Sequence, residues 1–147
     1  MSDGNPPKAE EGSVLFLCNH NTIRSPMAEA LTKSLFPRRL YAQSAGLQEG
    51  WLDAFVVAVL AEEGIDIADH EPQLLDHLDD GAFDVIVTLT PSAHHRALEL
   101  TRTQSVEVEY WPVPDPTATQ GTRDQQMAAY RETRDYIRKR IEERFGP

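Results

Sequence analysis

The only cysteine of the chain, Cys18, directly follows an apolar run over residues 14–17, and Arg24 stands six residues further on. The run has the composition of a buried strand, and Ser25 and Pro26 are typical of the start of a helix. Such a strand brings Cys18 to the carboxyl edge of a sheet, where open α/β proteins bind ligands. The loop would then lie over a helix N-terminus, whose N–H groups and dipole attract oxyanions and stabilise a thiolate. The spacing predicts a thiolate nucleophile in an anion-binding loop and indicates phosphoryl chemistry.

This predicted anion-binding loop, which we call the oxyanion loop, offers its backbone and one cationic side chain to a ligand. Arg24 carries a planar guanidinium that can bind two oxygens of a phosphate or an arsenate. Ser25 is expected to be the N-cap of the following helix. An inert buried cysteine on a strand is the alternative interpretation of Cys18, but the strand before it and the helix start after it favour chemistry. The loop consists of Asn19, His20, Asn21, Thr22, Ile23 and Arg24.

A second candidate catalytic residue, Asp115, lies just past the last predicted strand, between Pro114 and Pro116. Phosphotransfer to a thiolate needs an acid, because an alkoxide or phenoxide is a poor leaving group without a proton. The carboxylate is expected at the same edge of the sheet as Cys18, and the prolines stiffen its loop. An ordinary Asp-Pro turn is the alternative.

Composition limits the classes of protein to which the chain can belong. Its 147 residues predict a flexible tail over 1–12 and one domain over 13–147. Fourteen basic and 24 acidic residues give a net charge of −10, which argues against a nucleic-acid partner. A single cysteine permits no internal disulfide and is consistent with a cytoplasmic location. The longest apolar run, 54–61, is too short to span a bilayer, so no membrane partner is expected.

The order of predicted elements indicates an α/β domain, with a parallel sheet and helices on both faces. Asp53 is expected to cap the second helix, and His94 and His95 to lie on a solvated helix face. Because the two histidines have no further ligands at a suitable spacing, no metal site is expected. Strands are predicted over 14–18, 40–44, 83–89 and 106–110, and helices over 26–36, 54–63, 73–78, 91–103 and 123–144.

The chain resembles the low-molecular-weight protein tyrosine phosphatases, a family that also includes thioredoxin-linked and mycothiol-linked arsenate reductases. The resemblance implies a four-stranded sheet in the order 2-1-3-4. It also implies that Asp115 protonates the leaving group and then activates water, and that Ser25 assists the thiolate. Asn21 would adopt a left-handed backbone, braced by Ser44 and His70. The segments that carry the resemblance are 14–18, 24–31, 44–46, 64–70, 84–87 and 115–116.

Three positions depart from the family pattern. Ile23 stands where many members have a second cysteine, so an oxidised Cys18 has no local disulfide partner. His20 replaces a common glycine in the loop. Thr117 follows Pro116 where aromatic residues usually line the phosphotyrosine slot, and Trp51 is expected to supply one wall of that slot.

From these residues we predict a metal-independent phosphomonoesterase without a cofactor, most simply a protein tyrosine phosphatase. It would act through a phosphocysteine on a phosphorylated protein or a small aryl phosphate, and bind inorganic phosphate or other oxyanions. One alternative is an arsenate reductase that uses a small external thiol such as mycothiol, since the chain has no further cysteines to carry a disulfide. The other is a non-catalytic phosphate or phosphoprotein binder. The presence of Asp115 led us to favour hydrolysis.

Overall fold

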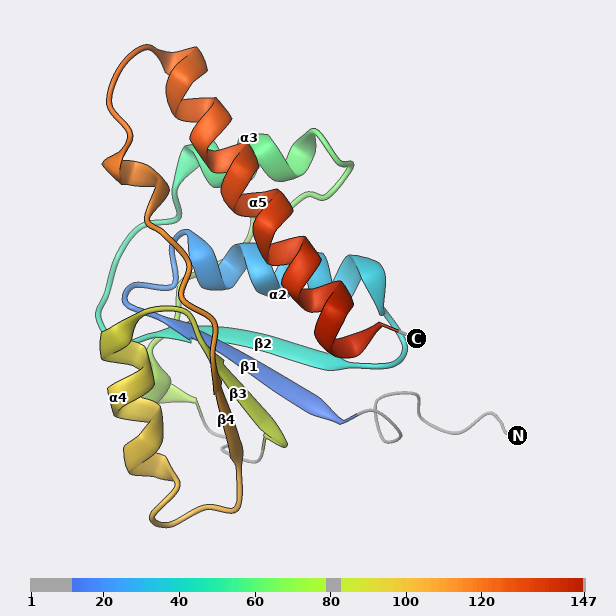
Figure 1. Cartoon of the computed structure of the whole chain (residues 1–147), viewed down its shortest axis with the longest axis vertical. Helices are drawn as coiled ribbons and strands as arrows, with labels where there is room; N and C mark the ends of the chain where they lie inside the picture. Colours follow the sequence, from blue (N-terminus) through green and yellow to red (C-terminus); the bar gives the residue numbers. More distant parts are fainter. Residues whose placement is uncertain (1–11, 79–82, 147) are drawn as a thin grey trace.

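A computed structural model describes residues 12–78 and 83–146, and its centre is a four-stranded parallel sheet in the order β2-β1-β3-β4 (Figure 1). The order 2-1-3-4 and the α/β class are therefore confirmed. All but the last residue of the predicted tail over 1–12 lies outside the described residues. The strands are β1 (Ser13–Cys18), β2 (Tyr41–Gly46), β3 (Val85–Thr88) and β4 (Glu107–Tyr110). The helices are α2 (Arg24–Leu35), α3 (Ala54–Ala61), α4 (Pro91–Leu100) and α5 (Arg123–Phe145), with short 3₁₀ helices η1 (Leu75–His77) and η2 (Pro116–Ala118).

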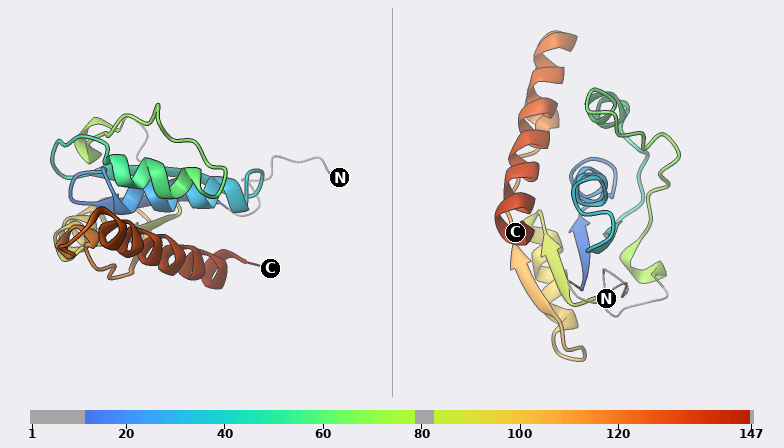
Figure 2. Two further views of the ribbon diagram at one scale, coloured as in Figure 1. Left: turned by 90° about the horizontal axis from the view of Figure 1, so that it is seen from above. Right: turned by 90° about the vertical axis from the view of Figure 1, so that its right-hand side faces the viewer.

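The two faces of the sheet have separate apolar cores because side chains alternate along the central strand β1. Val14, Phe16 and Cys18 belong to the core shared with α2 and α5. Leu15 and Leu17 belong to the core shared with α4. Figures 1 and 2 show α4 on one face, while α2 and α5 cover the other face and α3 packs outside them against α5. Burial on both faces explains why β1 reads as a continuous apolar run.

Hydrogen-bonding side chains mark the starts of three helices. Asp53 caps α3 by accepting from the backbone N–H groups of Phe55 and Val56, as predicted. Thr90 caps α4, and Thr122 forms a capping box with Gln125 at the start of α5. In the part of the chain that the structure describes, no helix combines the length and the apolar composition that a membrane span requires.

The predicted helix over 26–36 begins two residues earlier, and this corrects the prediction for Ser25. The N-cap of α2 is Ile23, which makes no side-chain capping bond, and Ser25 lies inside the first turn. The helix can start early because Asn21 has a φ of +60°, which turns the chain sharply before Ile23. Elsewhere the predicted helix over 73–78 shortens to η1, the helix over 91–103 ends at Leu100, and η2 was not predicted.

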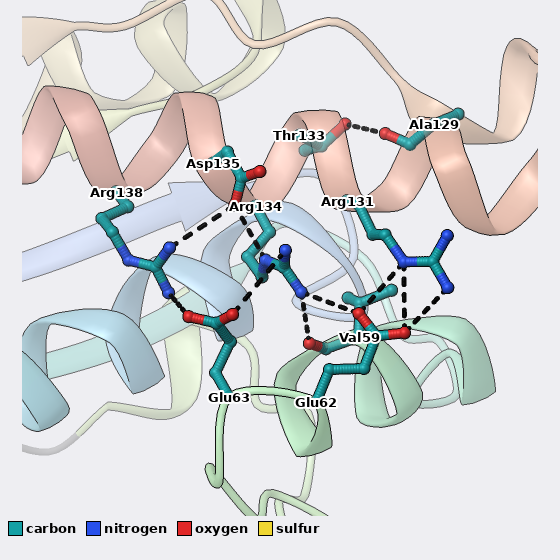
Figure 3. A network of polar contacts seen from close by, with 9 residues as sticks. All are labelled: Val59, Glu62, Glu63, Ala129, Arg131, Thr133, Arg134, Asp135 and Arg138. Atoms are coloured by element: carbon teal, nitrogen blue, oxygen red, sulfur yellow. Dashed lines mark hydrogen bonds and ion pairs between the residues drawn. The ribbon is translucent and has the colours of Figure 1, made fainter.

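An ion-pair network joins α5 to the end of α3 (Figure 3). The side chain of Arg134 is only 8% exposed, and it donates to the Val59 carbonyl at 2.8 Å and to the Glu62 carboxylate at 3.0 Å. Arg131 makes a two-pronged pair with the same Glu62, and Arg138 pairs with Glu63. The network holds α5 against α3, although the side chains of Arg131, Arg138, Glu62 and Glu63 reach solvent.

A second polar contact connects α5 to the oxyanion loop. The Tyr130 hydroxyl donates to the free carboxylate oxygen of Asp53 at 2.9 Å. The backbone N–H of Asp53 in turn donates to the Thr22 carbonyl at 3.2 Å. Burial and the Asp53 carboxylate raise the pKa of Tyr130, so its hydroxyl keeps its proton and remains a donor. The long C-terminal helix is thereby tied, through one aspartate, to the loop that follows Cys18.

Candidate functional site

Cys18 lies at the carboxyl end of β1, and its sulfur contacts one polar side chain. The residue is 3% exposed, and its Sγ lies 2.9 Å from the Ser25 Oγ. Ser25 is fully buried on the first turn of α2. The sequence prediction that Ser25 is the N-cap is wrong, but the structure does bring this hydroxyl to Cys18.

The direction of the Ser25–Cys18 hydrogen bond follows from its neighbours. The Asn21 amide nitrogen donates to both Ser25 Oγ and Ser44 Oγ, each at 2.8 Å. Ser44 donates its own proton to Glu29, which lies one helical turn beyond Ser25 on α2. Since Ser25 accepts from Asn21, its single proton is left for the Cys18 sulfur, the other acceptor being the more distant Ala45 carbonyl at 3.4 Å. This hydrogen bond fixes the position of the Cys18 sulfur relative to the first turn of α2.

The other side of the Asn21 amide is fixed as well. Its oxygen accepts from the backbone N–H of Gln73 at 2.9 Å and lies 3.1 Å from His70 Nε2. Burial lowers the pKa of His70 below its usual value, although the Glu29 carboxylate opposes the shift. A neutral His70 ring that carries its proton on Nε2 can donate a hydrogen bond to the Asn21 side-chain oxygen. The structure thus brings Asn21, Ser44 and His70 together, as the resemblance implied.

The oxyanion loop presents a row of backbone donors. Over residues 12–78 and 83–146, the N–H groups of residues 20–23 donate no hydrogen bond to the protein. The first N–H groups of α2 have no intrahelical acceptor either. Carbonyl groups of the loop are bound from behind, because Asn19 O accepts from Leu47 and Gln48 and Thr22 O accepts from Asp53. The loop can therefore offer several donors and a helix dipole to one anion.

Side chains fix the two ends of the loop. Thr90, the cap of α4, donates to the Asn19 side-chain oxygen at 2.8 Å. At the other end, Arg24 donates to the Val113 carbonyl at 2.9 Å, two residues before Asp115. That bond uses one guanidinium nitrogen and leaves further donors on Arg24 for an oxyanion. Ile23 packs against the core on the α2 face, where a second cysteine would stand in many relatives of the predicted family.

Asp115 sits at the start of η2 and is held by Thr117. One carboxylate oxygen accepts from the Thr117 backbone N–H at 2.9 Å and from its hydroxyl at 2.7 Å. Burial raises the pKa of Asp115, but the two Thr117 hydrogen bonds and the Arg24 charge outweigh burial and lower that pKa below its usual value. The geometry therefore favours an ionised carboxylate, whereas a leaving-group acid needs a proton.

The two residues predicted to line a substrate slot, Trp51 and Thr117, lie in different depressions. Trp51 lines a depression of about 570 Å³ together with His20 of the oxyanion loop. Thr117 lines another, of about 350 Å³, with Asp53 and Tyr130. The structure does not bring the two predicted walls into one pocket.

Sequence reasoning missed three groups that hold the site in place. The Val113 carbonyl positions Arg24, Gln73 supports Asn21, and Glu29 orients Ser44. Glu29 could have been found, because it lies four residues after Ser25 and so on the same face of the helix. Backbone groups such as the Val113 carbonyl leave no mark in a sequence. No cluster of three or more potential metal ligands occurs within 12–78 and 83–146.

His94 corrects a smaller prediction, because it is not a solvated residue of α4. Its ring stacks on Tyr110 with 4.8 Å between centroids, and its Nδ1 lies 3.0 Å from the Thr88 hydroxyl. His95, on the same helix, is exposed, as predicted.

Comparison with known proteins gives both reductases and phosphatases. "Arsenate reductase" of Bacillus subtilis is 31% identical over 91% of this chain and 95% of its own length. "Glutaredoxin arsenate reductase" of Synechocystis sp. is 27% identical over 88% of this chain and 92% of its own length. Among solved structures, the low molecular weight protein tyrosine phosphatase from T. tengcongensis has a TM-score of 0.73 and 26% identity, covering 88% of this chain and 95% of its own.

These relatives overturn the function that we favoured from the sequence. The curated relatives carry the name arsenate reductase, which supports the alternative over a protein tyrosine phosphatase. The model of the low molecular weight phosphotyrosine protein phosphatase family matches residues 13–145, and relatives of the chain are enzymes. The chain belongs to the low molecular weight phosphotyrosine protein phosphatase family.

Proposed function

We propose that the protein is an arsenate reductase that takes its electrons from an external low-molecular-weight thiol. The observation that carries the proposal is a lone Cys18 in a loop of free backbone donors, in a chain with no second cysteine to complete a disulfide. Arsenate shares the shape and charge of phosphate, so the same loop can bind it. The names of the Bacillus subtilis and Synechocystis relatives support the reaction, and the second name pairs it with an external thiol protein.

The first step forms a bond between Cys18 and arsenic. The thiolate attacks the arsenic of dihydrogen arsenate, and one of the two hydroxyl groups of the anion takes the proton of the other and leaves as water. Backbone N–H groups of the oxyanion loop and Arg24 hold the remaining oxygens, where negative charge is spread. The proton that Ser25 donates keeps the sulfur oriented toward the bound oxyanion before attack.

The second step transfers electrons. The external thiol, as its thiolate, attacks the Cys18 sulfur, and the sulfur–arsenic bond breaks with its electron pair on arsenic. Arsenic(V) becomes arsenic(III) and leaves as arsenite, while Cys18 remains as a mixed disulfide. A second external thiol then attacks the outer sulfur and regenerates Cys18. Overall, one arsenate and two thiols give one arsenite, one external disulfide and one water.

The remaining site residues have positioning roles in this proposal. Asn21 orients Ser25, and Ser44 and His70 hold Asn21. Asp115 stays ionised at the rim beside Arg24, where its charge offsets that of the guanidinium. None of these steps needs a metal or an organic cofactor.

The test is arsenite formation by wild type and Cys18→Ser with glutathione, mycothiol or dithiothreitol as reductant. Wild type should consume two thiols for each arsenite, and Cys18→Ser should form none. Intact-mass measurement after a single turnover should show one thiol attached at Cys18, which is unambiguous because no other cysteine exists. Folded wild type that binds arsenate but forms no arsenite with any of these thiols would contradict the proposal, as would an active Cys18→Ser.

A further inference from the structure

A cavity of about 570 Å³ lies directly beside the oxyanion loop. We call it the rim pocket, and its lining includes His20, Glu49, Trp51, Gln73 and His77. His20 belongs to both the pocket and the loop, two residues after Cys18. The proposed reaction requires a second thiol to reach the sulfur of Cys18, and the volume lies in the range of small-molecule sites.

The pocket and the oxyanion loop are built as one unit. The backbone N–H groups of Leu47 and Gln48 donate to Asn19 O, and His20 Nδ1 contacts the Glu49 carbonyl at 3.1 Å. A Cβ atom on Gly50 would lie only 2.8 Å from the Thr22 methyl group, so the pocket wall lies against the loop. A ligand seated in the pocket is therefore held at a fixed place relative to the bound oxyanion.

The lining suits an organic molecule better than an inorganic anion. Trp51 is 91% exposed, far more than the other large hydrophobic side chains that reach the surface in the described chain, which are 37–46% exposed. The lining also includes Glu49, Gln48, His20 and His77, whose side chains carry a carboxylate, an amide and two imidazoles. A carboxylate repels arsenate, whereas amide and hydroxyl groups find both donors and acceptors here, and the indole face offers contact area.

We propose that the rim pocket binds the body of the thiol reductant, a small molecule whose thiol is attached to amide- and hydroxyl-bearing groups. This assignment rests on the proposed reductase function. The pocket holds the body of the thiol while the sulfur reaches over His20 toward Cys18. Bound there, the thiol attacks the Cys18 sulfur in the electron-transfer step described above.

Trp51 provides a binding assay that does not depend on turnover. The protein has two tryptophans, and the other, Trp111, is 2% exposed and reports on the core. S-methylated glutathione and S-methylated mycothiol cannot react, so either can be titrated as a probe. One of them should shift or quench the Trp51 emission in a saturable way, and Trp51→Phe should abolish the signal.

Variants of the lining then separate thiol binding from oxyanion binding. His77→Ala and Glu49→Gln should each raise the dissociation constant of the probe, and the KM for the thiol, by about fivefold or more. The KM for arsenate should change less than about twofold. Gln120→Ala, in the separate depression that contains Thr117, is the matched control and should change neither value.

The outcomes distinguish the pocket from the reaction. The pocket assignment is wrong, and the reductase function is unaffected, if the protein reduces arsenate but binds neither probe saturably. The same holds if neither His77→Ala nor Glu49→Gln changes the KM for the thiol. A protein that binds a probe but forms no arsenite overturns the function, and with it the assignment of the ligand as reductant. Saturable activity with a glutaredoxin and none with any small thiol also overturns the pocket assignment.

Discussion

At the scale of single residues, hydrogen-bond direction is the property that makes Cys18 a candidate nucleophile. Glu29 takes the Ser44 proton, Asn21 donates to both serines, and the Ser25 proton therefore points to sulfur. Together these contacts favour donation from Ser25 to sulfur, since its other acceptor, the Ala45 carbonyl, is more distant at 3.4 Å. Three predictions concern this network and the carboxylate at the rim.

Ser25→Ala removes the donor to the Cys18 sulfur. A hydrogen bond to a charged group contributes about 1.5–3 kcal/mol, so arsenite formation should fall by about ten- to a hundredfold. Ser34→Ala, an exposed serine on the same helix, is the control and should keep the wild-type rate. Equal rates for Ser25→Ala and wild type would show that the sulfur does not depend on this hydroxyl.

Asp115→Asn tests the role of the rim carboxylate. Because Thr117 and Arg24 keep this group ionised, we expect it to donate no proton in the reaction, and arsenite formation should stay within about tenfold of wild type. The measurement is the initial rate at saturating arsenate and thiol. A loss of a hundredfold or more would mean that Asp115 does act as an acid.

His70→Gln tests the pH dependence of stability. The pKa of His70 is lower in the folded protein than the usual value of about 6.5 for an unfolded chain. As pH falls through that value, the unfolded state takes up the proton first, so the free energy of unfolding falls. Urea unfolding at pH 7.5 and pH 5.5 should show a smaller difference for His70→Gln than for wild type. The same difference in both proteins would contradict the argument.

At the scale of elements, α5 connects the helices that surround the oxyanion loop. It packs on α2 and α3, and its Tyr130 reaches the oxyanion loop through Asp53. The Asp53 cap of α3 was readable from the sequence. The ion pairs in Figure 3 were not, because a row of alternating charges looks the same whether it faces water or another helix.

Arg134→Met tests the junction between α3 and α5. The substitution keeps the buried stem but leaves the Val59 carbonyl without its donor, so the free energy of unfolding should fall by about 1–3 kcal/mol. Arg131→Met removes an exposed partner of the same Glu62 and should cost less. Chemical denaturation of both variants measures these free energies of unfolding. Equal decreases for the two variants would show that the burial of Arg134 makes no extra contribution to stability.

At the scale of the whole molecule, the sequence predicted the sheet and the reactive loop far better than the surroundings of the site. The apolar run before Cys18 has the composition of a buried strand, and the family resemblance supplied the order 2-1-3-4. The start of α2 was misplaced because a left-handed Asn21 precedes it. Trp51 and Thr117, the residues predicted to line the substrate slot, lie in different depressions, because the relative position of their segments depends on packing that no local pattern encodes.

The single cysteine also determines how the protein responds to oxidants. No second thiol can trap oxidised Cys18, so hydrogen peroxide without thiol should carry it past the sulfenic acid to the irreversible two- and three-oxygen acids. Intact-mass spectra should show these products and no internal disulfide. Added glutathione should divert the sulfur into a reversible mixed disulfide. A persistent sulfenic acid with full recovery of activity would contradict this.

The bond from Arg24 to the Val113 carbonyl joins residues 89 positions apart and has a consequence for synthesis on the ribosome. The cysteine emerges early, but the carbonyl that orients the arginine emerges only after β4, and α5 follows later still. A growing chain therefore carries an ordinary thiol through most of translation. The site is assembled only after nearly the whole domain has emerged, so truncated chains released early should not bind oxyanions.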